Sequence, residues 1–181
     1  MIISVLKDGS APAPLPQDED ARLEALRSYL VLDTPVDPAF DRITQLASRL
    51  CNAPIALLSL IAEDRQWFKS TVGLEDCEMP RNWSFCSHAI LEDGSAPMVV
   101  CDTHLDARFE TNPLTVGLPY IRFYAGAPLI ASGGHKLGTL CVIDTRPRRH
   151  FDNEQAEVLQ LLAALAVDLL EFHKVKTTYR L

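Results

Sequence analysis

Hydrophobic residues recur at helical spacing through the first part of the chain. Between residues 18 and 30 the leucines alternate with charged positions, at Leu23, Leu26 and Leu30. A second periodic stretch begins at Asp37-Pro38, an aspartate that can cap a helix followed by a proline suited to its first turn, and ends at residues 52–54. The pattern predicts two amphipathic helices, preceded by an extended, proline-rich leader over residues 1–17.

Apolar runs typical of strands follow these helices. The run IALLSLIAED is apolar at most positions, and RQWFKSTVG resumes after a tight turn at Glu63-Asp64. Two further runs, IRFYAGAPLIA and KLGTLCVID, flank a glycine-bearing turn at residues 132–135. Each pair predicts an antiparallel hairpin.

The segment between these hairpins mixes short elements. Ser84 can cap a short helix that runs to about Leu91, PMVVCD predicts a strand, and DARFETNPL predicts a loop with a helical turn. The order therefore indicates two helices and then an antiparallel sheet with a helical insertion inside it.

The longest periodic stretch lies at the C-terminus. Asp152 and Gln155 form a capping box at its start. Apolar residues then repeat at intervals of 4, 3, 4 and 3, a heptad seam made of Val158, Leu162, Leu165, Leu169 and Phe172. The stripe is widened by Leu159, Leu161 and Ala166. One side of this helix can cover the sheet or the N-terminal helices while another pairs with a second subunit; a helix that packs only its own core is the alternative.

Composition narrows the class of protein. The chain has 181 residues, 48% of them hydrophobic and 23% charged, which suits one folded domain. A net charge of -7 and the lack of a basic cluster argue against a nucleic-acid partner, and the short basic run at residues 146–150 fits a solvated turn.

Location follows from what the chain lacks. MIISVLK has no secretory-signal pattern and no stretch approaches the ~20 apolar residues of a membrane span, so we expect a cytoplasmic protein without membrane association. Five cysteines, an odd number with irregular spacing, indicate free thiols.

Several phrases in a fixed order carry a resemblance to a known family: LDTP, IALLSLIAEDRQWFKSTVGL, WSFCSHAI, RFETNP, and IRFYAGAPL followed by LGTLCVID. Over about residues 18 to 172 the chain resembles a GAF domain, of the bacterial branch found ahead of histidine kinases and diguanylate cyclases. The resemblance implies an α+β fold with an antiparallel sheet of about six strands. Terminal helices would cover one face, and a helix-and-loop excursion would form a pocket on the other. It also implies a leader at 1–17, the domain at 18–175 and a tail at 176–181.

The same resemblance implies a regulatory role. We expect a non-enzymatic sensor of an unidentified small molecule, forming a homodimer through its terminal helices and acting on a downstream histidine kinase or cyclase. No cofactor can be named. Because the chain ends nine residues after Phe172, a stand-alone sensor and a fragment of a longer one both stay open. Two alternatives remain: a thiol enzyme like the free methionine-(R)-sulfoxide reductases, and an interaction module whose cavity is filled by its own side chains.

Cys86 is the candidate reactive group. It falls in the first turn of the short helix, where amide donors and the helix dipole favour a thiolate; the alternative is a small apolar side chain tucked beneath the helix. His88 lies about 200° further around that helix, which disfavours a catalytic pair. By resemblance, Cys86 falls where a reductase cysteine would and Cys77 lies upstream, but a third cysteine expected near residues 109–111 is absent.

Other chemistry finds less support. Cys77, Cys101 and His104 offer soft zinc ligands but lack the paired short spacings of a structural zinc site, so we expect no metal. The asparagine-lysine-phenylalanine-aspartate-glutamate pattern of cyclic-nucleotide-binding GAF domains is absent. Ser87 interrupts the cysteine-histidine dipeptide of bilin-binding members. We expect no catalytic residues.

A pocket with mixed walls is the remaining prediction, suited to a small, partly charged molecule. Arg108 and Arg122 could clamp a carboxylate, or salt bridges to Asp102 or Asp106 could hold them and fix the loop. Phe123 is a further wall residue. The candidate ligand-binding residues are Trp83, Phe85, Cys86, His88, Asp102, Arg108, Phe109, Asn112, Arg122 and Tyr124.

Overall fold

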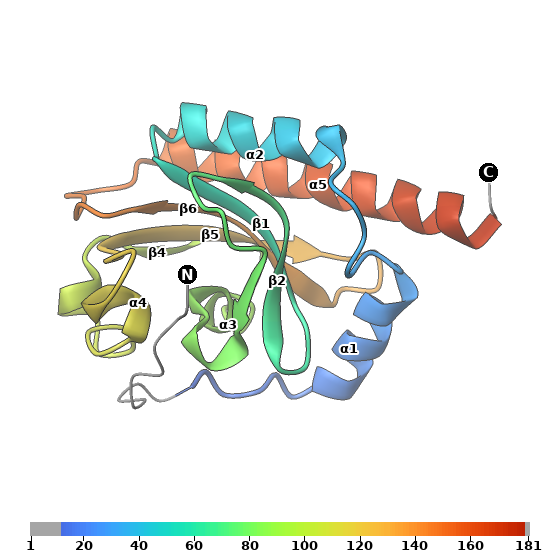
Figure 1. The fold of residues 1–181 in the computed structure, drawn as a ribbon, viewed down its shortest axis with the longest axis horizontal. Helices are drawn as coiled ribbons and strands as arrows, with labels where there is room; N and C mark the ends of the chain where they lie inside the picture. The colour runs from blue at the N-terminus through green and yellow to red at the C-terminus, as the bar shows by residue number, and fades with distance from the viewer. Residues whose placement is uncertain (1–11, 180–181) are drawn as a thin grey trace.

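A single antiparallel sheet runs through the molecule and is covered on both faces (Figure 1). The computed structural model describes residues 12–179. The sheet has six strands in the order β3-β2-β1-β6-β5-β4. Their bounds are β1 Ile55–Ile61, β2 Arg65–Val72, β3 Glu78–Pro80, β4 Met98–Val100, β5 Phe123–Ile130 and β6 Lys136–Asp144. The expected α+β fold with an antiparallel sheet of about six strands is confirmed.

Helices begin where the sequence supplies caps. The Asp37 carboxylate accepts a hydrogen bond from the Ala39 amide at 2.9 Å, and the Asp152 carboxylate accepts one from the Gln155 amide at 2.7 Å. Within residues 12–179 the α-helices are α1 Glu19–Ser28, α2 Pro38–Leu50, α3 Phe85–Ala89, α4 Pro113–Val116 and α5 Asn153–Tyr179. Two short 3-10 helices are η1 Arg81–Trp83 and η2 Thr103–Leu105.

The first face of the sheet is covered by α2 and α5, which lie side by side across it (Figure 1). Alanines at 125 and 127 of β5 leave room for α5 to approach closely. The buried face of α5 consists of Leu159, Leu162, Ala163, Ala166 and Leu170. These positions follow the helical period, so the sheet and the helix share one continuous apolar core.

The outward stripe of α5 differs in register from the expected seam. Leu162 is 7% exposed and belongs to the core, whereas Leu165 and Phe172 are 52% and 66% exposed. The exposed apolar stripe is Leu161, Leu165, Phe172, Val175 and Tyr179. Two apolar stripes overlap on this helix. The stripe that packs against the sheet is the one that contains the small alanines of the helix, Ala163 and Ala166. The helix continues to Tyr179, beyond the domain boundary expected at residue 175.

The expected leader and tail are described only in part. Residues 12–17 have no helix or strand apart from the start of a turn at residue 17. Residues 1–11 of the leader and 180–181 of the tail lie outside the described residues.

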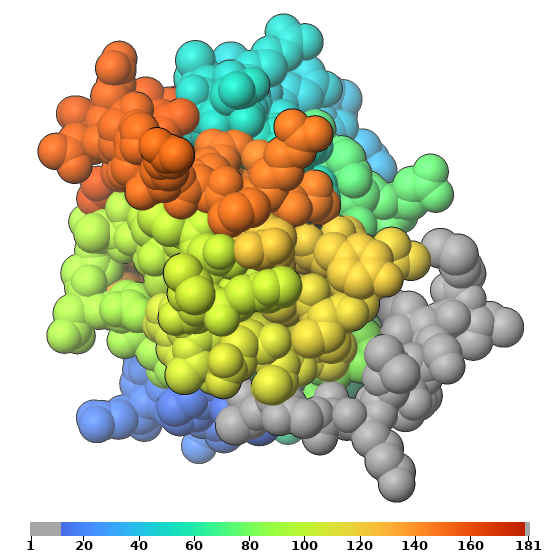
Figure 2. All heavy atoms as spheres, turned by 90° about the vertical axis from the view of Figure 1, so that its left-hand side faces the viewer, coloured from blue at the N-terminus to red at the C-terminus, as the bar shows by residue number. Residues whose placement is uncertain are grey.

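The second face is crossed by the excursion, which we define as residues 73–122 between β2 and β5. Its helices and strands are only three to five residues long. Figure 2 views the end of the molecule where the excursion, in yellow-green and yellow, meets the orange connection between β6 and α5. Elements this short cannot bury a whole sheet face as α2 and α5 do.

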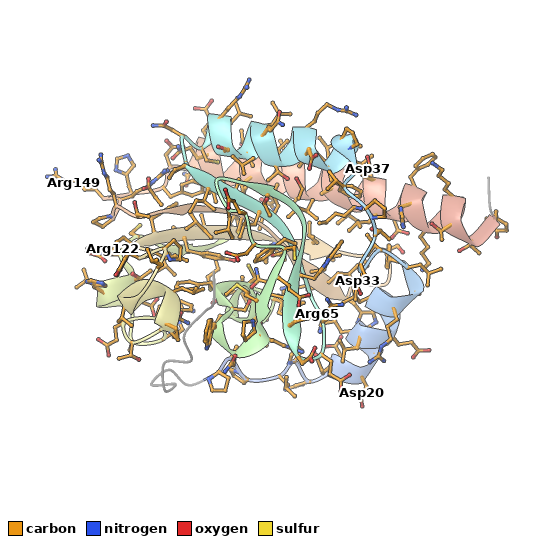
Figure 3. All side chains as sticks on the ribbon, in the orientation of Figure 1. Asp20, Asp33, Asp37, Arg65, Arg122 and Arg149 are labelled. Carbon is orange, nitrogen blue, oxygen red and sulfur yellow. The ribbon has the colours of Figure 1, made fainter. Side chains whose placement is uncertain are left out.

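The connection between α1 and α2 is fixed to β2 by two cations. Arg65 pairs with Asp33 at 2.7 Å (Figure 3). The buried Lys69 ammonium donates to the Thr34 hydroxyl and to the Pro35 carbonyl, both at 2.8 Å. The phrase LDTP therefore forms a structured joint.

The helix α1 lies at the end of the sheet where the turns between β1 and β2 and between β5 and β6 are found (Figure 1). Glu19 receives the Arg22 guanidinium at 2.7 Å and that of Arg81, in η1, at 2.5 Å. Burial raises the pKa of the Glu19 carboxyl, but the two guanidinium groups outweigh this and lower it to about 2. Just beyond its other end, the Tyr29 hydroxyl donates to Glu171 of α5 at 2.6 Å. Thus α1 joins the excursion to α5.

Replacing Glu19 by alanine should destabilise the protein by about 3 kcal/mol at pH 7, because it leaves two largely buried guanidinium groups without their carboxylate. The lowered pKa makes this contribution complete above pH 4.5 and lost as the pH falls toward about 2. Urea unfolding followed by circular dichroism measures both effects. Asp18→Ala, which breaks an exposed pair with His135, is the control and should cost under about 1 kcal/mol. Equal costs for the two variants would contradict the assignment.

Candidate functional site

A cavity of about 560 Å³ lies between the second face of the sheet and the excursion. Its floor includes Ile55, Leu57 and Phe68 of the sheet, and its roof includes Phe85, Leu114 and Ile121 of the excursion. Exposed residues on two segments of the excursion, Asp76, Glu78 and Leu118, also line it. The cavity therefore opens to solvent between these segments.

The wall nearest the sheet is α3. The Ser84 hydroxyl accepts a hydrogen bond from the Ser87 amide at 2.9 Å and starts the helix, as its sequence predicts. Phe85 stacks on Phe109 with ring centroids 4.1 Å apart and contacts Tyr124 at 5.4 Å. Aromatic packing thus joins α3 to the loop that follows β4 and to β5.

Cys86 of α3 is the centre of a buried polar cluster. Its side chain is tucked beneath the helix against the sheet, is 2% exposed and lines the cavity. Three groups donate to its sulfur at 3.1 to 3.3 Å: Gln66 Nε2, Ser59 Oγ and Tyr124 OH. The Cys141 sulfur lies 3.8 Å away. Four neighbouring strands, β2, β1, β5 and β6, therefore each supply one contact.

Strand register brings these groups together. Ser59 of β1 lies opposite Thr139 of β6, and Gly126 of β5 lies opposite Cys141. A methyl group at Gly126 would come within 2.1 Å of the Tyr124 hydroxyl, so glycine is what leaves space for that hydroxyl. The phrase RFYAG thus encodes the approach of the tyrosine to the sulfur.

The cluster sets the ionisation of both thiols. Burial raises the pKa of Cys86, but hydrogen bonds from Cys141, Ser59, Thr139 and Tyr124 outweigh it and lower the pKa below its usual value. The hydrogen bond to Cys86 and burial raise the pKa of Cys141 well above its usual value. Of the two thiols, Cys86 is therefore the one that ionises more readily.

Gln66 has an unused acceptor. The residue is 2% exposed and lines the cavity, and its amide nitrogen donates to Cys86. Its Oε1 atom has no hydrogen-bond partner among the described residues. Sequence reasoning missed this residue, although strand alternation places it on the same face as Phe68.

Four of the ten predicted site residues line the cavity: Trp83, Phe85, Cys86 and Tyr124. Two lie directly behind its wall. Phe109 is fully buried against Phe85, and Asn112 caps α4 while its amide donates to the Trp83 carbonyl at 3.1 Å.

The other four lie away from the cavity. His88 packs edge-on against Phe109, with centroids 4.9 Å apart. Arg108 is held by Asp106 at 2.7 Å, and Arg122 by Asp102 at 2.9 Å. Figure 3 shows Arg122 at the left-hand side of the molecule and Arg65 near its middle. The salt-bridge alternative describes both arginines, and their contact with a ligand stays untested. Phe123 points to the other face, into the core beneath α2 and α5.

The described residues contain no group of side chains suited to a metal ion. Among residues 12–179, no three His, Cys, Asp or Glu side chains lie together so as to hold a metal ion. All five cysteines are free thiols.

The pH dependence of Cys86 reactivity is a direct test of the cluster. Modification by methyl methanethiolsulfonate, followed by peptide mass spectrometry, should reach half its maximal rate at a pH below the usual cysteine pKa of about 8.5. Tyr124→Phe removes one donor to the thiolate and should move this midpoint upward by about one pH unit. Tyr120→Phe, a change at an exposed tyrosine, should leave it in place. A midpoint near 9 in the unmodified sequence would refute the cluster's effect.

Comparison with known proteins adds three findings. The GAF domain family model matches residues 35–168. A cyclic di-GMP phosphodiesterase of Pseudomonas aeruginosa is 39% identical over 168 residues, which are 93% of this chain and 28% of that protein. The chain thus spans just over a quarter of that relative.

Solved structures share the fold. One is a domain of a protein assigned as a two-component sensor histidine kinase from Sinorhizobium meliloti, with a TM-score of 0.62 and 14% identity over 82% of this chain and 100% of that one. Another is a type II free methionine-R-sulfoxide reductase from Thermoplasma acidophilum, with a TM-score of 0.58 and 14% identity over 84% of this chain and 96% of that one. At this identity the likeness is one of fold alone.

Proposed function

Because the chain belongs to the GAF domain family, we propose that it is a non-enzymatic regulatory sensor in which a small molecule occupies the cavity and alters the terminal helices. The cavity itself carries this proposal. At about 560 Å³ it has the size of a small-molecule site, and the side chains of residues 12–179 leave it unfilled. Occupancy shifts the helices only as far as the ligand's affinities for the two conformations differ.

A chain of contacts supports transmission from the cavity to α5. Trp83 lines the cavity and ends η1, which begins at Arg81. Arg81 is bound to Glu19 at the start of α1. Tyr29, which follows the last residue of α1, is bound to Glu171 of α5. A ligand that displaces η1 would therefore also shift α1, a helix of ten residues, and through it α5.

Pairing with a second copy through α5 is the proposed mode of assembly. The exposed stripe from Leu161 to Tyr179 keeps heptad-like spacing, which suits a coiled-coil partner of the same kind. Leu46 and Leu50 of the neighbouring α2 are also exposed and extend the apolar surface. Two such stripes would bury one another.

The output would come from a second module. The relative that shares 39% identity is a much longer phosphodiesterase, so we infer that this domain acts beside a kinase, a cyclase or a phosphodiesterase. No helix in residues 12–179 is long and apolar enough to cross a membrane. Five unpaired cysteines favour a reducing compartment, and we propose the cytoplasm.

A second candidate function rests on one observation. Cys86 lines the cavity with Cys141 at 3.8 Å, which is the arrangement a thiol enzyme of the methionine sulfoxide reductase type would need for attack and resolution. If the protein forms methionine from free methionine sulfoxide in the presence of a dithiol reductant, and Cys86→Ser abolishes this activity, the protein is a thiol enzyme and the sensor proposal is wrong. Under the sensor proposal no methionine forms.

Filling the cavity tests the sensor proposal. In a thermal-shift screen of small-molecule fragments, a cavity ligand at 100 times its dissociation constant should raise the melting temperature by roughly 5–10 °C. Leu114→Trp, on α4 at the cavity, should abolish the shift. Val116→Trp, on the same helix but exposed and outside the cavity, should retain it. Hits that survive Leu114→Trp, or no hits at all, would argue against the proposal.

Charge in the α5 stripe tests assembly. Leu165→Glu should weaken the dimer at least ~10-fold, since it places paired carboxylates in an apolar seam. Leu105→Glu, at a leucine of η2 that is 86% exposed, should not. Size-exclusion chromatography with light scattering measures both. A monomeric parent protein at micromolar concentration would rule out this assembly.

A further inference from the structure

Two buried thiols lie in contact at the wall of the cavity. The sulfurs of Cys86 in α3 and Cys141 in β6 are 3.8 Å apart, and both residues belong to the apolar cluster on the second face of the sheet. Both are free thiols. We propose that a hydroperoxide that enters the cavity oxidises Cys86, and that Cys141 then joins it in a reversible disulfide. The inference does not depend on which other small molecule the cavity binds.

The cavity offers a route to Cys86. That residue lines the cavity although it is only 2% exposed, and the exposed residues Asp76, Glu78 and Leu118 line the same space where it opens to solvent. The cavity of about 560 Å³ is far larger than hydrogen peroxide, which occupies roughly the volume of two waters, ~60 Å³. Cys141 is fully buried behind this wall, so the peroxide meets Cys86 first.

The surroundings of Cys86 favour the attacking thiolate. Gln66 Nε2, Ser59 Oγ and Tyr124 OH donate to its sulfur from 3.1 to 3.3 Å, which stabilises the charged form. The thiolate attacks one oxygen of the peroxide: an S–O bond forms, the O–O bond breaks, and the sulfur is oxidised by two electrons to a sulfenic acid. The departing oxygen takes up the proton that the thiol released. Hydrogen peroxide therefore leaves as water and an alkyl hydroperoxide as its alcohol.

Cys141 is placed to complete the reaction. The hydrogen bond to Cys86, burial and the negative charge of Cys86 raise the pKa of the Cys141 thiol, so it stays protonated while Cys86 is ionised. Oxidation of Cys86 removes that charge. Cys141 then attacks the Cys86 sulfur: an S–S bond forms, the S–O bond breaks, and the hydroxide leaves as water with the proton of Cys141. A dithiol reductant returns both thiols by exchange.

The disulfide would reposition α3. A disulfide bond is shorter than the distance between the two thiols, so the sulfurs must approach each other. Cys141 lies in a strand paired on both sides, whereas α3 has five residues, so the helix is the part that moves. Loss of the thiolate charge also weakens the hydrogen bonds from Ser59 and Tyr124. Peroxide would therefore change the cavity wall that Phe85 forms.

Peroxide treatment of the full chain tests the pair. Reduced protein at pH 7 receives stoichiometric hydrogen peroxide, the remaining thiols are alkylated, and the peptides are mapped by mass spectrometry without reductant. The Cys86 and Cys141 peptides should be found linked, with the loss of two hydrogen masses, and dithiothreitol should separate them. Because its thiolate is stabilised, Cys86 should react at least about fivefold faster than the exposed Cys77.

Substitutions separate the two steps. Cys141→Ser and, as a second variant, Cys141→Ala should stop the reaction at the sulfenic acid, which dimedone traps on Cys86. Cys77→Ser should link as the parent does. Leu114→Trp, at the cavity, should slow the linkage at least about fivefold by closing the route, while Val116→Trp, outside it, should not.

The parent protein alone decides whether the link forms. Oxidation of Cys77 or Cys101 while Cys86 stays reduced would overturn the proposal, as would dimedone adducts on Cys86 without any link to Cys141. Linkage at an unchanged rate in Leu114→Trp would overturn entry through the cavity. Each of these results would leave the sensor proposal standing, because that proposal is tested by ligand binding and not by oxidation.

Discussion

A buried sulfur that must receive hydrogen bonds holds the functional half of this molecule together. The helix α3 has five residues, too few to be stable alone, so its position depends on what it touches. Cys86 places one acceptor against donors from neighbouring strands, and Phe85 adds an aromatic stack beside it. Since buried polar groups favour hydrogen-bond partners, these donors fix where the helix lies on the sheet.

The cavity exists because long helices cover one face of the sheet, whereas only short elements cover the other. On one face α2 and α5, of 13 and 27 residues, present long apolar stripes that fill the space. On the other, the excursion offers elements of three to five residues separated by loops. These elements pack on the sheet through Cys86 and the apolar residues around it, and they leave a cavity open between Phe68 of β2, Trp83 of η1 and Leu114 of α4.

Residues that line the cavity also connect it to the helices on the other side of the fold. The short helix η1 contributes Trp83 to the cavity and Arg81 to the carboxylate of α1. The end of α1 is in turn bonded to α5 through Tyr29. Gln66 and Tyr124, two of the polar residues that line the cavity, belong to the sheet, while Arg108 and Arg122 of the excursion pair with Asp106 and Asp102 and fix its loops.

What the sequence determined by itself was local: the caps at Asp37, Ser84 and Asp152, the hairpin turns, the helical and strand periods, and the family. These depend on residues within a few positions of one another, so a linear pattern records them. Only the tertiary structure decided the lining of the cavity and the seam of α5. Gln66 meets Cys86 across 20 residues, and Arg122 meets Asp102 across 20, through strand pairing that no local pattern encodes. On α5, Leu161 and Leu162 both fit an apolar stripe, and which of them turns outward was fixed by contact with the sheet.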